Sequence, residues 1–160
     1  MYAEASDKAK LALVHTLAVS SGARGMVAGQ AMDIAAEASA NALSLPEIEA
    51  LQKRKTGDLI CWACEAGPLL ADQDSLAMMR YGQNLGLAFQ IADDILDVEG
   101  DADEVGKATG KDDAAGKATF VSLLGLDEAK RRANALVEAA CDALSPYGCL
   151  LYTSPSPRDA

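Results

Sequence analysis

Residues 89–101 read FQIADDILDVEGD and place three aspartates on about a turn and a half of an apolar helical pattern, with no lysine or arginine among them. At about 100° per residue, Gln90, Asp93, Asp94 and Asp97 share one face, and the apolar side chains occupy the other. Like charges one turn apart destabilise a helix by a few tenths of a kcal/mol. We therefore expect this acidic face either to be solvated or to bind a cation.

The ligand chemistry favours Mg²⁺ over other cations. Mg²⁺ keeps several waters and is held by one or two protein carboxylates together with phosphate oxygens. A calcium-binding EF-hand loop starting at Asp97 would need glycine where Ala102 stands. A solvated face usually mixes charge signs, whereas this segment continues into further acids before the first lysine. The sequence therefore predicts a magnesium site at Asp93, Asp94 and Asp97.

Two basic segments could supply the cations that a magnesium-bound anion needs. One is KRKTG at 53–57, and the other is GKATGKDDAAGK at 106–117, in which Lys107, Lys111 and Lys117 lie beside or near glycines. Lysine offers a mobile charge suited to phosphate, and glycine lets backbone amides approach it. Neither segment has P-loop spacing after a strand. Each could be an ordinary exposed charge run, but with the acidic face they predict a metal–diphosphate site.

The hydrophobic periodicity is helical almost throughout, so the predicted fold class is all-α. Ser44 and Glu47 form a capping-box pattern, Gly57 is expected to interrupt the helix that they open, and Gly67-Pro68 is expected to stop or kink the next. Residues 100–117 are expected to form a long functional loop. The predicted helices cover 3–19, 23–40, 44–55, 58–66, 74–98, 119–124 and 127–144.

Composition limits the function classes. The chain has 160 residues, is 50% hydrophobic and has a formal net charge of −10, which predicts one domain or a piece of one and disfavours nucleic acid and anionic membranes as partners. No apolar run appears long enough for the roughly 18 residues of a membrane span, and the N-terminus lacks the pattern of a signal peptide. The expected location is cytoplasmic.

The cysteines and the histidine are expected to be structural. Cys61 and Cys64 form a CxxC pattern, but a zinc site would need two more ligands, and the strand that precedes a thioredoxin-type motif is absent. Two buried helical thiols are favoured over redox chemistry. His15, the single histidine, lies in an apolar helical run and is expected at the edge of a core.

The last residues differ from the rest of the chain in composition and periodicity. Cys149–Asp159, CLLYTSPSPRD, contains two Ser-Pro pairs and no helical pattern, and it resembles the translation of a DNA-sequencing adapter. We expect residues 1–148 to form the domain and residues 149–160 to be a non-native or disordered tail without function.

Five short motifs follow one another along the chain: GQAMD at 29–33, KTG at 55–57, GLAFQIADDILD at 86–97, GK at 106–107 and GKAT at 116–119. In this order and spacing they resemble the trans-prenyltransferase (polyprenyl synthase) family, most closely the C-terminal half of bacterial farnesyl diphosphate synthases. The resemblance covers about residues 1–145. It implies an isoprenoid-synthase helical bundle that lacks its N-terminal helices.

The resemblance also implies roles for individual residues. Asp93, Asp94 and Asp97 match a metal-binding motif, in which Asp93 and Asp97 are the expected metal contacts. The remaining matches are to residues that bind substrate or line its cavity: Gln30, Asp33, Lys55, Thr56, Gln90, Lys107 and Lys117. All of these except Gln30 and Asp33 are also expected to assist catalysis. Ala28-Gly29 stands where the family usually has Gly-Gly.

The implied reaction is a magnesium-assisted ionisation of an allylic diphosphate, dimethylallyl or geranyl diphosphate, followed by attack of isopentenyl diphosphate to give farnesyl diphosphate. The implied parent is a homodimer. A geranylgeranyl or longer-chain synthase is the alternative, and a non-catalytic acidic helical interaction module is a second one. The family's first aspartate-rich motif would lie upstream of Met1, so we expect this chain to be inactive alone.

Overall fold

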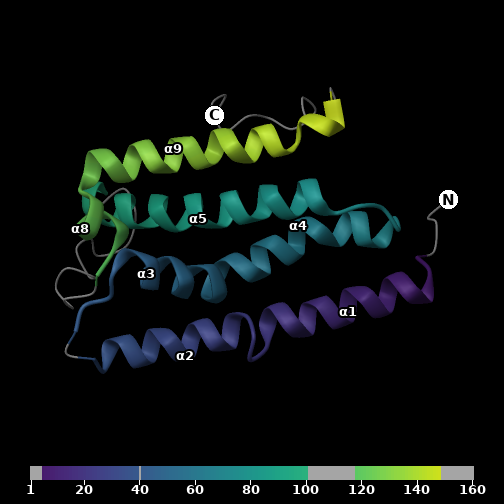
Figure 1. Cartoon of the computed structure of the whole chain (residues 1–160), viewed down its shortest axis with the longest axis horizontal. Helices are drawn as coiled ribbons and strands as arrows, with labels where there is room; N and C mark the ends of the chain where they lie inside the picture. Colours follow the sequence, from purple (N-terminus) through teal and green to yellow (C-terminus); the bar gives the residue numbers. More distant parts are fainter. Residues whose placement is uncertain (1–4, 40, 101–117, 149–160) are drawn as a thin grey trace.

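The computed structural model describes residues 5–39, 41–100 and 118–148, and within these ranges every regular element is helical (Figure 1). The all-α prediction is confirmed. The predicted loop lysines Lys107, Lys111 and Lys117, and the tail 149–160, lie outside the described residues. The elements are α1 (Asp7–Ser21), α2 (Met26–Glu37), α3 (Leu45–Gln52), η1 (Lys53–Gly57), α4 (Asp58–Leu70), α5 (Leu76–Glu99), α8 (Phe120–Leu124) and α9 (Leu126–Ala143).

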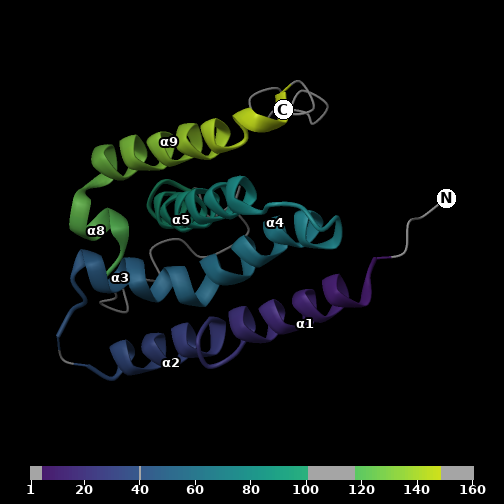
Figure 2. The same ribbon diagram turned by 45° about the vertical axis from the view of Figure 1, so that its right-hand side comes forward.

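The helices form successive layers. Helix α9 packs along α5, α5 packs on η1 and α4, and α1 and α2 pack on α4 and η1 from the far side (Figures 1 and 2). Helix α8 contacts α5 and α9. This order brings the acidic face of α5 to the same end of the bundle as α2, α3 and η1.

The predicted interruption at Gly57 is wrong. Helices α3 and α4 are joined without a break by η1, a five-residue π-helical turn, so that one helical path runs from Leu45 to Leu70. Gly57 is buried against α5, where a β-carbon built on Gly86 would lie 3.1 Å from the Gly57 Cα. Glycine here permits close helix packing instead of ending the helix. Single π-helical turns often occur at functional sites.

The stop or kink predicted at Gly67-Pro68 comes before the observed end of the helix. Helix α4 continues through Gly67-Pro68 to Leu70, with Pro68 inside the helix. The chain turns at Ala71 and Asp72, and Asp72 has a positive φ of 54°. The remaining predicted helices agree with the observed ones to within a few residues.

Local caps define several helix starts. Ser44 and Glu47 form the predicted capping box of α3, in which the Ser44 N–H donates to Glu47 Oε2 at 2.8 Å. The hydrogen bonds from Ser44 hold the pKa of Glu47 below its usual value. Thr119 caps α8 in the same manner, accepting from the Ser122 N–H at 3.1 Å.

A small core connects four helices at the end of the bundle that holds the acidic face. Ile48 of α3, Ile91 of α5, Phe120 of α8 and Ala129 of α9 form one buried cluster. Ile91 and Phe120 have no exposed surface. This cluster holds α5 and the start of α8 in register with α3.

The expectation that no apolar run reaches the length of a membrane span is not upheld. The helical stretch Asp7–Glu37, 31 residues long, contains a window with a mean hydropathy of 1.2, of which 6% is buried. The turn at Gly22–Gly25 divides this stretch into α1 and α2. Helices of soluble proteins can have the same length and composition, so these properties alone do not assign the stretch to a membrane.

Candidate functional site

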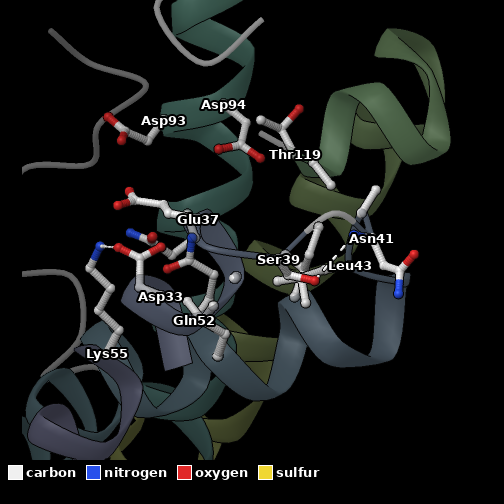
Figure 3. Close-up of a pocket in the computed structure, with 16 residues that line it drawn as sticks. Asp33, Glu37, Ser39, Asn41, Leu43, Gln52, Lys55, Asp93, Asp94 and Thr119 are labelled. Carbon is white, nitrogen blue, oxygen red and sulfur yellow. Dashed lines mark hydrogen bonds and ion pairs between the residues drawn. The ribbon is translucent and has the colours of Figure 1, made fainter. Parts of the chain in front are cut away.

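The acidic face of α5 borders a cavity of about 670 Å³ between α5, α2 and the α3–η1 helix (Figure 3). We call it the polar cavity. Most of its charged and amide-bearing lining residues come from these helices: Asp33, Glu37, Gln52, Lys55, Gln90, Asp93 and Asp94. The structure thus brings Asp33, Lys55, Gln90, Asp93 and Asp94 together, although the sequence separates them by up to 61 positions (94 − 33).

Two of the predicted residues form an ion pair across the α2–η1 contact. Lys55 Nζ donates to Asp33 Oδ2 at 2.6 Å, and the side chains are 32% and 9% exposed. The helices approach closely because Gly29 has no side chain: a β-carbon there would lie 2.2 Å from the Lys55 backbone nitrogen. The pair places an ammonium beside a nearly buried carboxylate at the cavity wall.

The adjacent aspartates of α5 have different surroundings. Asp94 Oδ2 accepts a hydrogen bond from the Phe120 N–H at 2.7 Å and so anchors the start of α8. Asp93 is exposed, and in Figure 3 Asp93 and Asp94 lie across the cavity from Asp33 and Glu37. Asp97 is half-buried and does not line the polar cavity. Asp93 is therefore the α5 carboxylate most open to a ligand in the cavity.

A second cavity of about 530 Å³ adjoins the first at Lys55, which lines both. We call it the apolar groove. Its walls include exposed apolar side chains of α2, and the predicted residues Gln30 and Thr56 lie here instead of in the polar cavity. The full lining is Met26, Val27, Gln30, Ala31, Ile34, Lys55 and Thr56. A charged compartment and an apolar one thus lie next to each other, and Lys55 lines both.

Sequence reasoning did not identify two residues of the polar cavity, Glu37 and Gln52. Glu37 lies four residues after Asp33, and Gln52 lies three before Lys55, so helical spacing could have placed each on the face of a predicted site residue. Neither belongs to a quoted motif, and only the packing of α3 against α2 and α5 shows that they share a cavity.

The donor set fits magnesium held together with an anion. Among the described residues, no three His, Cys, Asp or Glu side chains are close enough to form a metal site by themselves. Mg²⁺ does not require such a cage, since it commonly uses one or two carboxylates, waters and phosphate oxygens. Asp93 offers an exposed carboxylate, and the buried Gln52 Oε1 has no hydrogen-bond partner. The polar cavity therefore fits a hydrated cation that shares a diphosphate.

The two CxxC thiols have the properties of structural cysteines. Cys61 and Cys64 are free and half-buried, and Cys61 Sγ donates to Glu65 Oε1 at 3.2 Å. Burial and the nearby Glu65 raise the pKa of Cys61 to about 12, which keeps this thiol protonated. His15 is exposed on α1 instead of lying at the edge of a core.

The comparisons with known proteins agree with this geometry. Residues 2–144 match the polyprenyl synthetase family model. The chain is 40% identical over 145 residues to a farnesyl diphosphate synthase of Escherichia coli K12, covering 88% of this chain and 48% of that protein. It therefore belongs to the polyprenyl synthetase family, and it spans about half the length of the curated relatives it matches.

Two solved structures have the same fold. An FPP/GFPP synthase from Zymomonas mobilis, solved without ligand, is 43% identical with a TM-score of 0.79, covering 90% of this chain and 48% of that one. A geranyltransferase from Helicobacter pylori, complexed with magnesium and isoprenyl diphosphate, is 33% identical with a TM-score of 0.77, covering 92% and 50%. The all-α architecture is thus that of part of an isoprenyl synthase domain.

Proposed function

We propose that this chain is part of a trans-prenyltransferase that condenses isopentenyl diphosphate with an allylic diphosphate. The observation that supports this most directly is the junction of the polar cavity and the apolar groove at Lys55. An allylic diphosphate has a charged head and an apolar tail, and the two compartments match these parts in chemistry. Membership of the polyprenyl synthetase family supports the same reaction class.

The residues of the polar cavity would hold and activate the diphosphate head. In the proposal Lys55, which lines both compartments, and Thr56, which lines the adjoining apolar groove, bind diphosphate oxygens. Lys107 and Lys117 add charge from the segment outside the described residues. Preplaced cations favour ionisation because negative charge develops on the departing diphosphate. Gln90 and Asp33 orient these groups at the wall of the polar cavity, and Gln30 lines the apolar groove.

The carboxylates of α5 would hold Mg²⁺. Asp93 would do so from the lining of the polar cavity, Asp97 from one turn further along the helix and outside that lining, and Asp94 would be a further contact. Magnesium bound there would neutralise charge on the diphosphate. The apolar groove would exclude water from the reacting carbon of the substrate, which protects a reactive cation from hydrolysis.

The product is proposed to be farnesyl diphosphate, because the first relatives matched are farnesyl diphosphate synthases. A longer product is the alternative, in keeping with the FPP/GFPP synthase named above. We propose a homodimeric, cytoplasmic parent without stable membrane insertion, and we expect the present chain to bind diphosphate weakly and to have no turnover by itself.

A binding measurement separates this proposal from an acidic helical interaction module. Calorimetry of the chain with inorganic diphosphate should show binding that requires Mg²⁺. Asp93→Ala should weaken it, since that change removes a carboxylate open to the cavity. An interaction module has no reason to bind diphosphate and magnesium together, so no binding at millimolar ligand would count against the enzyme assignment.

A chimera tests the reaction itself. Residues 1–148 would replace the matched half of the Escherichia coli farnesyl diphosphate synthase, and condensation of radiolabelled isopentenyl diphosphate with geranyl diphosphate would be measured. We expect activity in the chimera, none in the chain alone, and a fall by orders of magnitude with Asp93→Ala in the chimera. Full activity of that variant would contradict the site assignment. The length of the labelled product would separate the farnesyl and longer-chain alternatives.

A further inference from the structure

The side-chain oxygen of Gln52 is buried and has no hydrogen-bond partner. Gln52 is the last residue of α3, three positions before Lys55, and both residues line the polar cavity. Figure 3 shows Gln52 beside Asp33, with Asp93 and Asp94 across the cavity. A buried acceptor without a donor destabilises the folded state, and such groups are rare in folded proteins. The position of Gln52 in a candidate ligand site suggests that a ligand supplies the donor.

The charged groups around this cavity limit which ligand could donate a hydrogen bond to the Gln52 oxygen. Ionised carboxylates such as Asp33 and Asp93 accept hydrogen bonds and cannot donate them. The Lys55 ammonium already donates to Asp33 at 2.6 Å and makes no bond to Gln52. A fully ionised diphosphate likewise has no N–H or O–H group. A hydrated Mg²⁺ differs, because it keeps several waters whose O–H groups are donors.

We propose that Gln52 is a positioning residue, whose side-chain oxygen accepts a hydrogen bond from a water of the hydrated magnesium ion that enters the polar cavity with a diphosphate. This role rests on the proposed function and assigns a task to a residue outside the aspartate-rich motif. Through that water, Gln52 on α3 would hold the hydrated ion against α5, so the carboxylates of one helix need not fix its position alone.

A rotated amide group gives a competing possibility. The oxygen and nitrogen of a glutamine side chain are similar in size, and a rotation would present Nε2 as a donor to a phosphate oxygen. The two possibilities respond oppositely to glutamate. Gln52→Glu retains the acceptor but loses the N–H group and adds a negative charge that repels phosphate.

The experiment uses the whole chain with inorganic diphosphate and three variants. Gln52→Met keeps the length of the side chain and removes its polar atoms, Gln52→Glu keeps an acceptor, and Gln83→Met is the matched control. Gln83 is exposed on α5 and lies away from the polar cavity, in a neighbouring pocket that Gln52 also lines. Calorimetry gives the Mg²⁺ concentration that half-saturates diphosphate binding, and urea unfolding without ligand gives the stability.

We expect Gln52→Met to raise the half-saturating Mg²⁺ concentration about three- to tenfold, the effect of losing one hydrogen bond of ordinary strength. Without ligand, the same variant should be as stable as the wild type or more so, because it removes an unsatisfied buried acceptor. Gln52→Glu should keep or lower the half-saturating Mg²⁺ concentration, and Gln83→Met should change neither quantity.

Four results would overturn this role. An unchanged magnesium dependence in Gln52→Met would show that the oxygen does not serve the metal, and a loss of ligand-free stability there would show that it has a resident partner. Weaker binding in Gln52→Glu than in Gln52→Met would assign the amide N–H to phosphate instead. A wild-type chain that binds no diphosphate would overturn the proposed function, and this role with it.

Discussion

The ammonium of Lys55 lies 2.6 Å from Oδ2 of Asp33, and this ion pair connects η1 to α2 at the junction of the polar cavity and the apolar groove. The carboxylate side chain is only 9% exposed and the ammonium 32%. The contact places the main cation of the proposed diphosphate site on a helix whose position depends on a partner 22 residues earlier in the chain.

This burial predicts unequal effects of removing the two partners. Lys55→Met should lower the free energy of unfolding by about 1–3 kcal/mol, because the nearly buried Asp33 loses its neighbouring cation. Asp33→Asn should cost less, since the amide retains an acceptor and brings no buried charge. Urea unfolding measures both. The exposed pair Lys8–Asp72, with side chains 83% and 74% exposed, is the control, and Lys8→Met should change stability by less than about 0.5 kcal/mol. Equal losses at Lys55 and Lys8 would contradict the role of burial.

The neighbouring aspartates of α5 should separate binding from stability. Asp94→Ala removes the acceptor of the Phe120 N–H at the start of α8 and should cost about 1–2 kcal/mol of stability. Asp93→Ala should leave the free energy of unfolding unchanged or slightly higher, because it removes a negative charge one helical turn from Asp97. The same change should weaken magnesium-dependent diphosphate binding. Circular dichroism during urea titration and calorimetry test the two effects, and the reverse pattern would refute the division of roles.

Replacing either of two glycines, Gly29 or Gly67, by alanine should change the stability of the chain in opposite directions. Gly29→Ala should destabilise the chain by about 1–3 kcal/mol, because the new β-carbon would lie 2.2 Å from the Lys55 nitrogen and 2.5 Å from its Cα. It should also weaken diphosphate binding by displacing Lys55. Gly67→Ala is the control: nothing lies within 4 Å, and alanine within α4 should stabilise by up to about 1 kcal/mol. The midpoint temperature of thermal unfolding should fall in Gly29→Ala and rise in Gly67→Ala.

The thiol of Cys61 should react slowly in the folded chain. Its pKa is raised to about 12, chiefly by burial, so little thiolate exists at pH 8. Iodoacetamide at pH 8 should modify Cys61 at least about a hundredfold more slowly in the folded chain than in urea, where the pKa is near 8.5. Peptide mapping by mass spectrometry follows each cysteine separately, with exposed Cys141 as the control. Equal rates for Cys61 in both states would contradict its burial.

The same pKa fixes a dependence of stability on pH. Folding favours the neutral form of the Cys61 thiol. The contribution of this thiol to the free energy of unfolding is therefore fully present below the pKa of the unfolded chain, and it is lost as the pH rises toward about 12. We expect the free energy of unfolding of the wild type to fall between about pH 8.5 and 12 more steeply than that of Cys61→Ala. Parallel curves would show that the thiol does not contribute.

Local patterns in the sequence were sufficient for the fold class and for part of the site. Helical periodicity predicted the all-α class, and the spacing of Ser44 and Glu47 predicted a capping box that the structure confirms. The spacing of Gln90, Asp93 and Asp94 placed them on one face of a helix, and all three line the polar cavity. These features depend on residues within one or two turns of each other, which is the range that a sequence pattern describes.

Contacts between distant segments decided the rest. Gly57 favours a helix break when considered alone, but close packing against Gly86 keeps it within a continuous helical path. Asp94 has the same local pattern as Asp93, yet only Asp94 accepts from the Phe120 N–H, 26 residues away. Gln52 belongs to no motif, and its orphaned oxygen becomes meaningful only beside Asp33 and Lys55. The sequence by itself determined which residues share a helix face; the tertiary structure decided which faces meet, because burial, close packing and unsatisfied polar atoms arise only when helices pack together.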